Sequence, residues 1–203
     1  MGSSWDVPAP QEHGDLDEEV LFTEIGRALT EWEQVEGACA ELFAVLVSAP
    51  KKASHRAPAI RAWGAVTGFN ARCEMLKVAA AAYFRTRKQK RLAFENRFKL
   101  LITECLGFAG RRNEIAHGRV SIVYYYKRTQ GRKIGHFLLP SIYNPKKYNI
   151  KQSAAYVYTS KDVIHFRQEF TKLQWKLDAF RKLLNERTQP TKPGLIRRLP
   201  PLG

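Results

Sequence analysis

Three residue types that together can act on a phosphodiester stand close together in the second half of the chain. Arg112, Asn113 and His117 fall within six consecutive residues. A guanidinium can bind two phosphate oxygens at once, an imidazole can give or take a proton at neutral pH, and an amide can orient either group. Such a set is suited to cleaving RNA without a metal ion.

The chemistry of that cleavage follows from the ribose. A base removes the proton from the 2′-hydroxyl, whose oxygen attacks the adjacent phosphorus while a cation stabilises the added negative charge. DNA lacks this hydroxyl, so the reaction would be specific for RNA and would leave 2′,3′-cyclic phosphate ends. An ordinary structural role is also open, because a histidine near a helix end often binds the last carbonyls.

A long helix is expected to position these residues. The spacing predicts it over residues 90–117, with Gly118 ending it in a left-handed conformation. Its apolar stripe is Phe94, Phe98, Leu101, Cys105, Phe108, Arg112 and Ile115. Arg112 is the one charge in that stripe. Asn113 and His117, four residues apart, share a face, and Glu114 lies beside His117.

Three further helices are predicted, over residues 16–48, 57–84 and 160–186. The stripe of the first contains a single charge, Glu36. Glu36 and Arg112 are therefore expected to pair with each other, or to extend their head groups past the edge of the core. Thr159 and Asp162 have the spacing of a capping box for the last helix.

Between the third and fourth long helices the apolar period changes from 3.6 to 2. Strands are predicted at 120–126 and 134–139 around a turn at 129–132, and a third strand at 154–159. The expected fold is mainly α, an up-down four-helix bundle with a small antiparallel β element inserted at 119–159. One domain over 16–187 lies between a disordered acidic tail, 1–15, and a flexible basic tail, 188–203.

Charge is unevenly distributed along the chain. The formal net charge is +15, yet residues 1–24 hold seven of the nineteen acidic residues and no Lys or Arg. The remainder carries 34 basic and 12 acidic residues, a net of +22. This favours a polyanionic partner, with RNA or DNA preferred over a membrane surface. A basic protein with no such partner is the alternative.

Several classes of protein are disfavoured. No apolar run is long enough to span a bilayer, and the first residues lack a secretory signal. Three cysteines, Cys39, Cys73 and Cys105, form no CxxC pair and are expected to be buried, reduced thiols of a cytoplasmic protein. The histidines show no metal-ligand spacing with them, so neither a metal nor a cofactor is expected.

The run Arg112-Asn113-Glu114-Ile115-Ala116-His117, followed by Gly118, resembles the Arg-x(4–6)-His signature of the HEPN superfamily. Arg111 also fits that spacing, but Arg112 is preferred because a polar residue, Asn113, then follows the arginine. Residues 26–36 of the first helix also fit the pattern. The resemblance implies a helical bundle and a metal-independent endoribonuclease, acting as a homodimer whose two motifs share one cleft.

The resemblance also implies roles for these residues. Arg112 would bind the phosphate, His117 would transfer the proton and Asn113 would orient, with Glu36 and Glu114 supporting them. Cations near the cleft would bind RNA: Lys127, Arg128, Arg132, Lys133, Lys146, Lys147 and Lys151. Tyrosines 124–126 and Tyr143 would stack bases there, unless they only pack within strands.

Three functions remain open at this stage. The first is the RNA-cleaving enzyme, in the setting of a toxin with a cognate antitoxin or of a phage-defence effector. The second is a non-catalytic module that binds RNA or a nucleotide, or docks a partner. The third is a structural protein whose bundle only dimerises.

Overall fold

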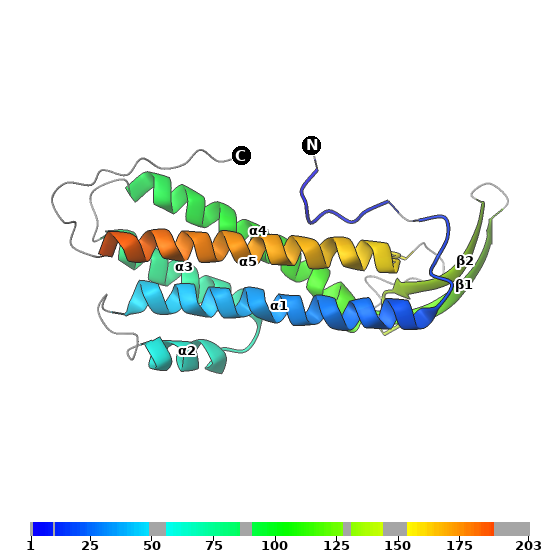
Figure 1. Ribbon diagram of the computed structural model, residues 1–203, viewed down its shortest axis with the longest axis horizontal. Helices are drawn as coiled ribbons and strands as arrows, with labels where there is room; N and C mark the ends of the chain where they lie inside the picture. Colours follow the sequence, from blue (N-terminus) through cyan, green and yellow to red (C-terminus); the bar gives the residue numbers. More distant parts are fainter. Residues whose placement is uncertain are drawn as a thin grey trace.

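The structure, a computed structural model, describes residues 2–9, 11–48, 56–85, 91–127, 131–143 and 154–188; the side chains of 91, 124–127, 131–134 and 186–188 are not among those described. These residues form α1 (Glu18–Val47), α2 (Arg56–Ala65), α3 (Phe69–Arg85), α4 (Arg91–His117), β1 (Arg119–Lys127), β2 (Gly131–Leu139) and α5 (Ser160–Thr188) (Figure 1). A mainly helical chain with a small antiparallel β element between α4 and α5 is confirmed.

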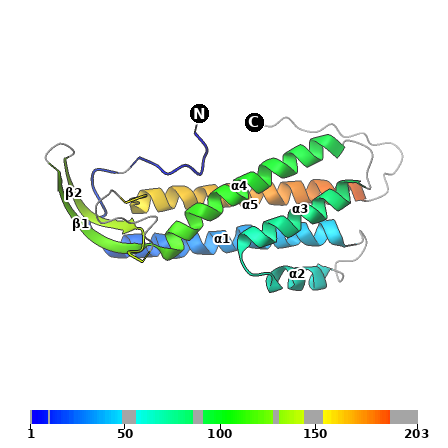
Figure 2. The same cartoon turned by 180° about the vertical axis from the view of Figure 1, so that it is seen from behind.

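The two longest helices, α1 and α5, lie side by side and run in the same direction (Figure 1). Two ion pairs between them show this, because residue numbers increase together along both helices. Arg167 lies 3.5 Å from Glu24, and Arg181 lies 3.4 Å from Glu41. Helix α4 runs the opposite way across them (Figures 1 and 2). The up-down order of four helices expected from the sequence is therefore not confirmed.

The reason lies in the second predicted helix. The single helix expected over 57–84 is wrong: the chain ends α2 at Ala65 and begins α3 at Phe69. Between them Gly68 has φ +83°, a left-handed conformation that glycine adopts without steric cost, and its carbonyl accepts the Arg72 N–H at the start of α3. The chain reverses at this break, so α3 runs in the direction of α1 (Figure 2).

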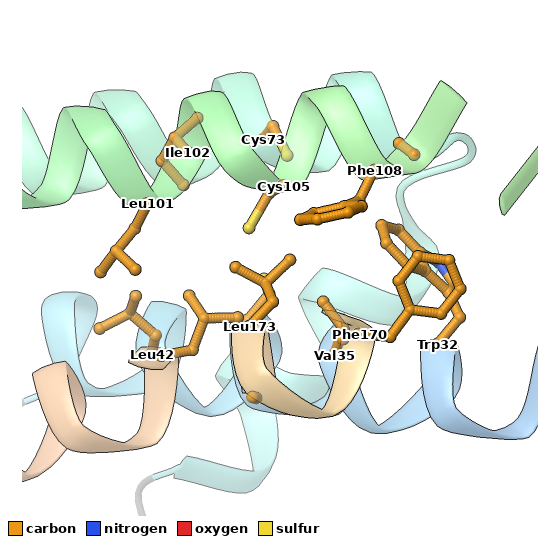
Figure 3. Packing of buried hydrophobic residues seen from close by; sticks show 14 of the residues in the cluster. Trp32, Val35, Leu42, Cys73, Leu101, Ile102, Cys105, Phe108, Phe170 and Leu173 are labelled. Atoms are coloured by element: carbon orange, nitrogen blue, oxygen red, sulfur yellow. The ribbon is translucent and has the colours of Figure 1, made fainter. Parts of the chain in front are cut away.

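Aromatic side chains from three helices meet in the core. Phe170 of α5 lies 5.1 Å from the ring of Trp32 and 5.8 Å from that of Phe108 (Figure 3). The edge-to-face geometry of both pairs is the one that aromatic quadrupoles favour. This cluster fixes the central part of α1 and the stretch of α4 directly before the turns that carry the candidate site.

The cysteines lie in the same core. Cys39, Cys73 and Cys105 are free and buried, as expected (Cys73 and Cys105 are labelled in Figure 3). A hydrogen bond with Cys105, together with burial, raises the pKa of Cys39 well above its ordinary value. Burial raises the pKa of Cys73 to about 12. Both thiols are therefore protonated at neutral pH and chemically inert.

The hairpin of β1 and β2 extends from the end of the bundle where α4 stops (Figure 1). Only Tyr158 of the predicted third strand pairs with it, through a single bridge to Leu138. Asp162 partners Thr159 as expected: its carboxylate accepts the Thr159 backbone N–H at 2.8 Å and the Thr159 hydroxyl at 2.9 Å, which is one half of a capping box. It fixes the start of α5.

The acidic tail, expected to be disordered over 1–15, makes defined contacts in the structure. Asp15 pairs with His136 of β2, and its carboxylate accepts the backbone N–H of Ser160 at 2.7 Å, at the start of α5. Nearer the terminus, the ring of Trp5 lies 5.9 Å from that of Phe108. The tail thus joins the hairpin, α5 and α4.

Candidate functional site

The site begins where α4 ends. Gly118 follows His117, the last residue of α4, but it does not adopt the left-handed conformation expected from the sequence. A Cβ on Gly118 would lie 2.6 Å from the side chain of Leu138 and 2.8 Å from the Glu114 carbonyl oxygen. Glycine is thus needed here for close packing between the helix end and β2.

Arg112 and Asn113 line an open cavity of about 550 Å³ between α1, the start of α3 and α4. The Arg112 side chain is half-buried, and its guanidinium donates to the Asn113 side-chain oxygen at 3.2 Å. Its Nε atom is buried and has no hydrogen-bond partner among the described residues. A buried, unsatisfied cationic donor next to a cavity is suited to binding an anionic ligand.

Glu36 lines the same cavity, but it does not pair with Arg112 as expected. One of its carboxylate oxygens binds Arg72, and the other accepts the indole N–H of Trp32 at 2.7 Å. Arg72 also donates from Nε to the Val66 carbonyl at 2.9 Å. The carboxylate is therefore already neutralised within the cavity wall, and Arg112 remains available.

Arg72 has no motif around it in the sequence, and sequence reasoning missed it. It comes to the cavity because the break at Gly68 places it on the first turns of α3, opposite Glu36 of α1. Its guanidinium lies 6.0 Å from the ring of Trp63, a distance suited to a cation–π contact. The one signal in the sequence was the glycine that interrupts the predicted helix.

The neighbouring arginine, Arg111, has a different environment. Its guanidinium lies 2.9 Å from the buried Glu114 carboxylate and donates to the Tyr158 hydroxyl at 3.0 Å. Tyr158 in turn donates to Glu114 at 2.6 Å. Burial, and then the hydrogen bond with Glu114, raise the pKa of Tyr158 above its ordinary value. Glu114 therefore binds Arg111 within the protein, and Arg112 is the arginine that faces the cavity.

His117 is exposed at the end of α4 and is not among the described residues that line the cavity. It lies five positions after Arg112 in the helix, about 7.5 Å along the axis and about 140° around it. A single chain thus brings Arg112 and Asn113 to the cavity and leaves His117 on the adjoining surface.

The other expected RNA-binding residues lie outside the described side chains. These are Lys127, Arg128, Arg132, Lys133, Lys146, Lys147 and Lys151. The same holds for tyrosines 124–126, whereas Tyr143 is 88% exposed. The proposed ring of cations around the site therefore stays a prediction.

Within the described parts of the chain, no group of three or more His, Cys, Asp or Glu side chains is placed to hold a metal ion. None of the described helices has the length and apolarity that crossing a bilayer requires. Comparisons with protein-family models, curated proteins and solved structures found no match to this chain.

Proposed function

We propose that this protein binds RNA and cleaves it without a metal ion, as an endoribonuclease of HEPN type. The observation that carries the proposal is the Arg112 guanidinium, half-buried at an open cavity with its Nε unsatisfied. A phosphodiester supplies the oxygen acceptors that this group lacks. The net charge of +22 over residues 25–203 supports a polyanionic substrate.

In this proposal the two ends of the motif divide the chemistry. Arg112, oriented by Asn113, holds the phosphate and stabilises the negative charge that develops when the 2′-oxygen attacks phosphorus. His117 removes the proton from the 2′-hydroxyl, and its exposed position leaves the imidazole accessible to RNA. The bond from phosphorus to the 5′-oxygen then breaks, and that oxygen takes up a proton from the imidazolium or from water. The products carry a 2′,3′-cyclic phosphate and a free 5′-hydroxyl.

A homodimer belongs to the same proposal, because the HEPN resemblance implies a cleft built from both copies of the motif. His117 lies outside the cavity of its own chain, so a second copy could supply the imidazole that acts beside Arg112. Action as a toxin or phage-defence effector, and control by an antitoxin protein, also remain parts of this proposal.

A non-catalytic RNA-binding module is the second candidate. It is favoured by the separation of His117 from the cavity that Arg112 lines. In that case Arg112 holds a phosphate without turnover, and binding falls steeply with salt because counterions are released from the RNA.

An assay of RNA cleavage in EDTA separates the two candidates. The purified chain is expected to cut single-stranded RNA to 2′,3′-cyclic phosphate ends, and His117→Ala is expected to abolish cutting, at least 100-fold. Because His117 is exposed, the melting temperature of the His117→Ala variant should stay near that of the wild type. His165→Ala, which removes an exposed histidine on α5, is the matched control and should cut normally.

The outcomes are distinct. RNA binding that Arg112→Ala weakens, without any cleavage, would favour the non-catalytic module. Cleavage that His117→Ala leaves intact would remove His117 from the mechanism. Absence of both cleavage and RNA binding at 150 mM salt would overturn the proposed function.

A further inference from the structure

We propose that the cavity beside Arg112 is a recognition pocket for one nucleobase of the RNA, and that it selects a base carrying an amino group. The proposal rests on the proposed function, since Arg112 would hold the phosphate next to that base. It adds residues that the Arg-x(4–6)-His motif does not contain: Glu33 on α1 and Asn70 on α3.

Charge balance argues for a base and a single phosphate. Among the described residues of the lining, two are acidic, Glu33 and Glu36, and two are basic, Arg72 and Arg112. Glu36 and Arg72 bind each other, which leaves one cation and one anion. A cavity with no net charge is a poor site for several phosphates, but one guanidinium can hold one phosphodiester. The rest of the volume suits a neutral group.

The remaining lining has the chemistry that a base requires. The half-buried ring of Phe69 gives the cavity an apolar wall, and the buried Trp32 supports it from behind, with ring centroids 5.0 Å apart in edge-to-face geometry. Two side-chain amides, Asn70 and Asn113, are exposed at the same cavity, and amides bind base edges. The volume of about 550 Å³ is within the range of small-molecule sites and accommodates a nucleotide.

The inner wall is held in place before any ligand arrives. Glu36 accepts the Trp32 indole N–H and binds Arg72, and Arg72 is further tied to the Val66 carbonyl. These contacts join α1 to the start of α3 and fix the shape of the cavity. A preformed site of this kind loses less conformational entropy on binding.

Glu33 gives the pocket its preference. Its carboxylate is exposed at the cavity and can only accept hydrogen bonds while it is ionised. Adenine, cytosine and guanine carry an exocyclic amino group that donates to such an acceptor, and uracil carries none. We therefore expect discrimination against uracil by about tenfold, within the range of a good base contact.

The test measures binding of AMP, CMP, GMP and UMP by calorimetry, alongside binding of a single-stranded RNA. The wild type is expected to bind at least one amino-bearing nucleotide about tenfold more tightly than UMP. Glu33→Gln should reduce that ratio to about threefold or less and leave UMP binding unchanged. Glu74→Gln, at an exposed glutamate of α3 outside the cavity, is the matched control.

Arg112→Ala should weaken all four nucleotides by a similar factor, because it removes the phosphate contact and leaves the base contacts. If RNA binds but the four nucleotides bind equally, or Glu33→Gln leaves the ratio unchanged, the base pocket is wrong while RNA binding stands. If neither RNA nor any nucleotide binds, the proposed function fails as well. Circular dichroism of each variant verifies that it is folded.

Discussion

Two adjacent arginines show how strongly position on a helix decides the role of a residue. Arg111 and Arg112 are about 100° apart around α4. Arg111 points toward the segment that precedes α5 and binds Glu114 and Tyr158. Arg112 faces the cavity. The spacing of the motif admits either arginine. The choice between them depends on Tyr158, which lies 47 residues further along the chain than Arg111.

Removal of the Glu114 carboxylate tests the structural role of this network. Glu114→Ala leaves the Arg111 charge, whose side chain is 17% exposed, without its partner. The free energy of unfolding is expected to fall by about 3 kcal/mol, as measured by urea denaturation. Glu74→Ala breaks the exposed pair with Lys77 and should cost about 0.5 kcal/mol or less. Equal costs for the two variants would contradict a structural Glu114.

The motif residues of the site could be predicted from the sequence, and its other members could not. Arg112 and Asn113 are recognisable because a local spacing carries them. Arg72, Glu33 and Asn70 reach the cavity only through the packing of three helices. That packing depends on the reversal at Gly68, whose left-handed conformation is not encoded in an apolar stripe.

Among the elements, α4 carries glycines that look alike in the sequence but differ in surroundings. A Cβ on Gly107 would lie 2.5 to 2.7 Å from three atoms of the Trp5 ring. A Cβ on Gly110, one turn later, would meet nothing within 4 Å. The absence of a side chain at Gly107 therefore lets Trp5 of the tail pack against α4. Gly110 makes no such contact and only lowers the helix propensity of α4.

Alanine at these two positions should have different effects on stability. Gly110→Ala is expected to raise the free energy of unfolding by about 0.5 to 1 kcal/mol through helix propensity. Gly107→Ala has the same propensity gain but displaces Trp5, so its net effect should be smaller or negative. Its tryptophan emission should also shift to the red as Trp5 becomes solvated. Identical stabilities and spectra would mean that the tail does not rest on α4.

For the molecule as a whole, regular periods in the sequence were a good guide wherever no backbone irregularity interrupts them. Helices α4 and α5 and the hairpin are predicted because a helical or strand period continues along each of them, with Arg112 as the one charge in the stripe of α4. The packing of the N-terminal tail could not be predicted in this way, because it joins residues far apart in sequence. Asp15 and Ser160, for example, are 145 residues apart. The shared direction of α1 and α5 was not predicted either, because the expected helix order took α2 and α3 as one helix and so missed a reversal of the chain.

Because folding raises the pKa of a buried thiol, the stability of the whole protein is expected to fall as pH rises in the alkaline range. Folding raises the pKa of Cys73 from 9.0 to about 12, so its contribution is complete below pH 9 and is lost as pH rises toward 12. Tyr156 and Tyr158, whose pKa values are also raised by burial, act in the same direction above pH 10.

Urea denaturation at pH 7, 9 and 11 measures this dependence. The wild type is expected to lose more stability than Cys73→Ala between pH 9 and 11, by on the order of 2 kcal/mol. Because the comparison uses the change of stability with pH, the constant stability cost of the small cavity that alanine leaves cancels. Parallel curves for the two proteins would show that the thiol does not titrate differently on folding.

The shared direction of α1 and α5 has a consequence for how the chain is made. The side-chain contacts between them join residues 140 positions apart, such as Glu31 and Thr171. At about 5 to 20 residues per second, a ribosome needs roughly 7 to 28 seconds to add that much chain. During this interval the apolar face of α1 has left the ribosome without its main neighbour, so we expect the nascent chain to expose that face until α5 arrives.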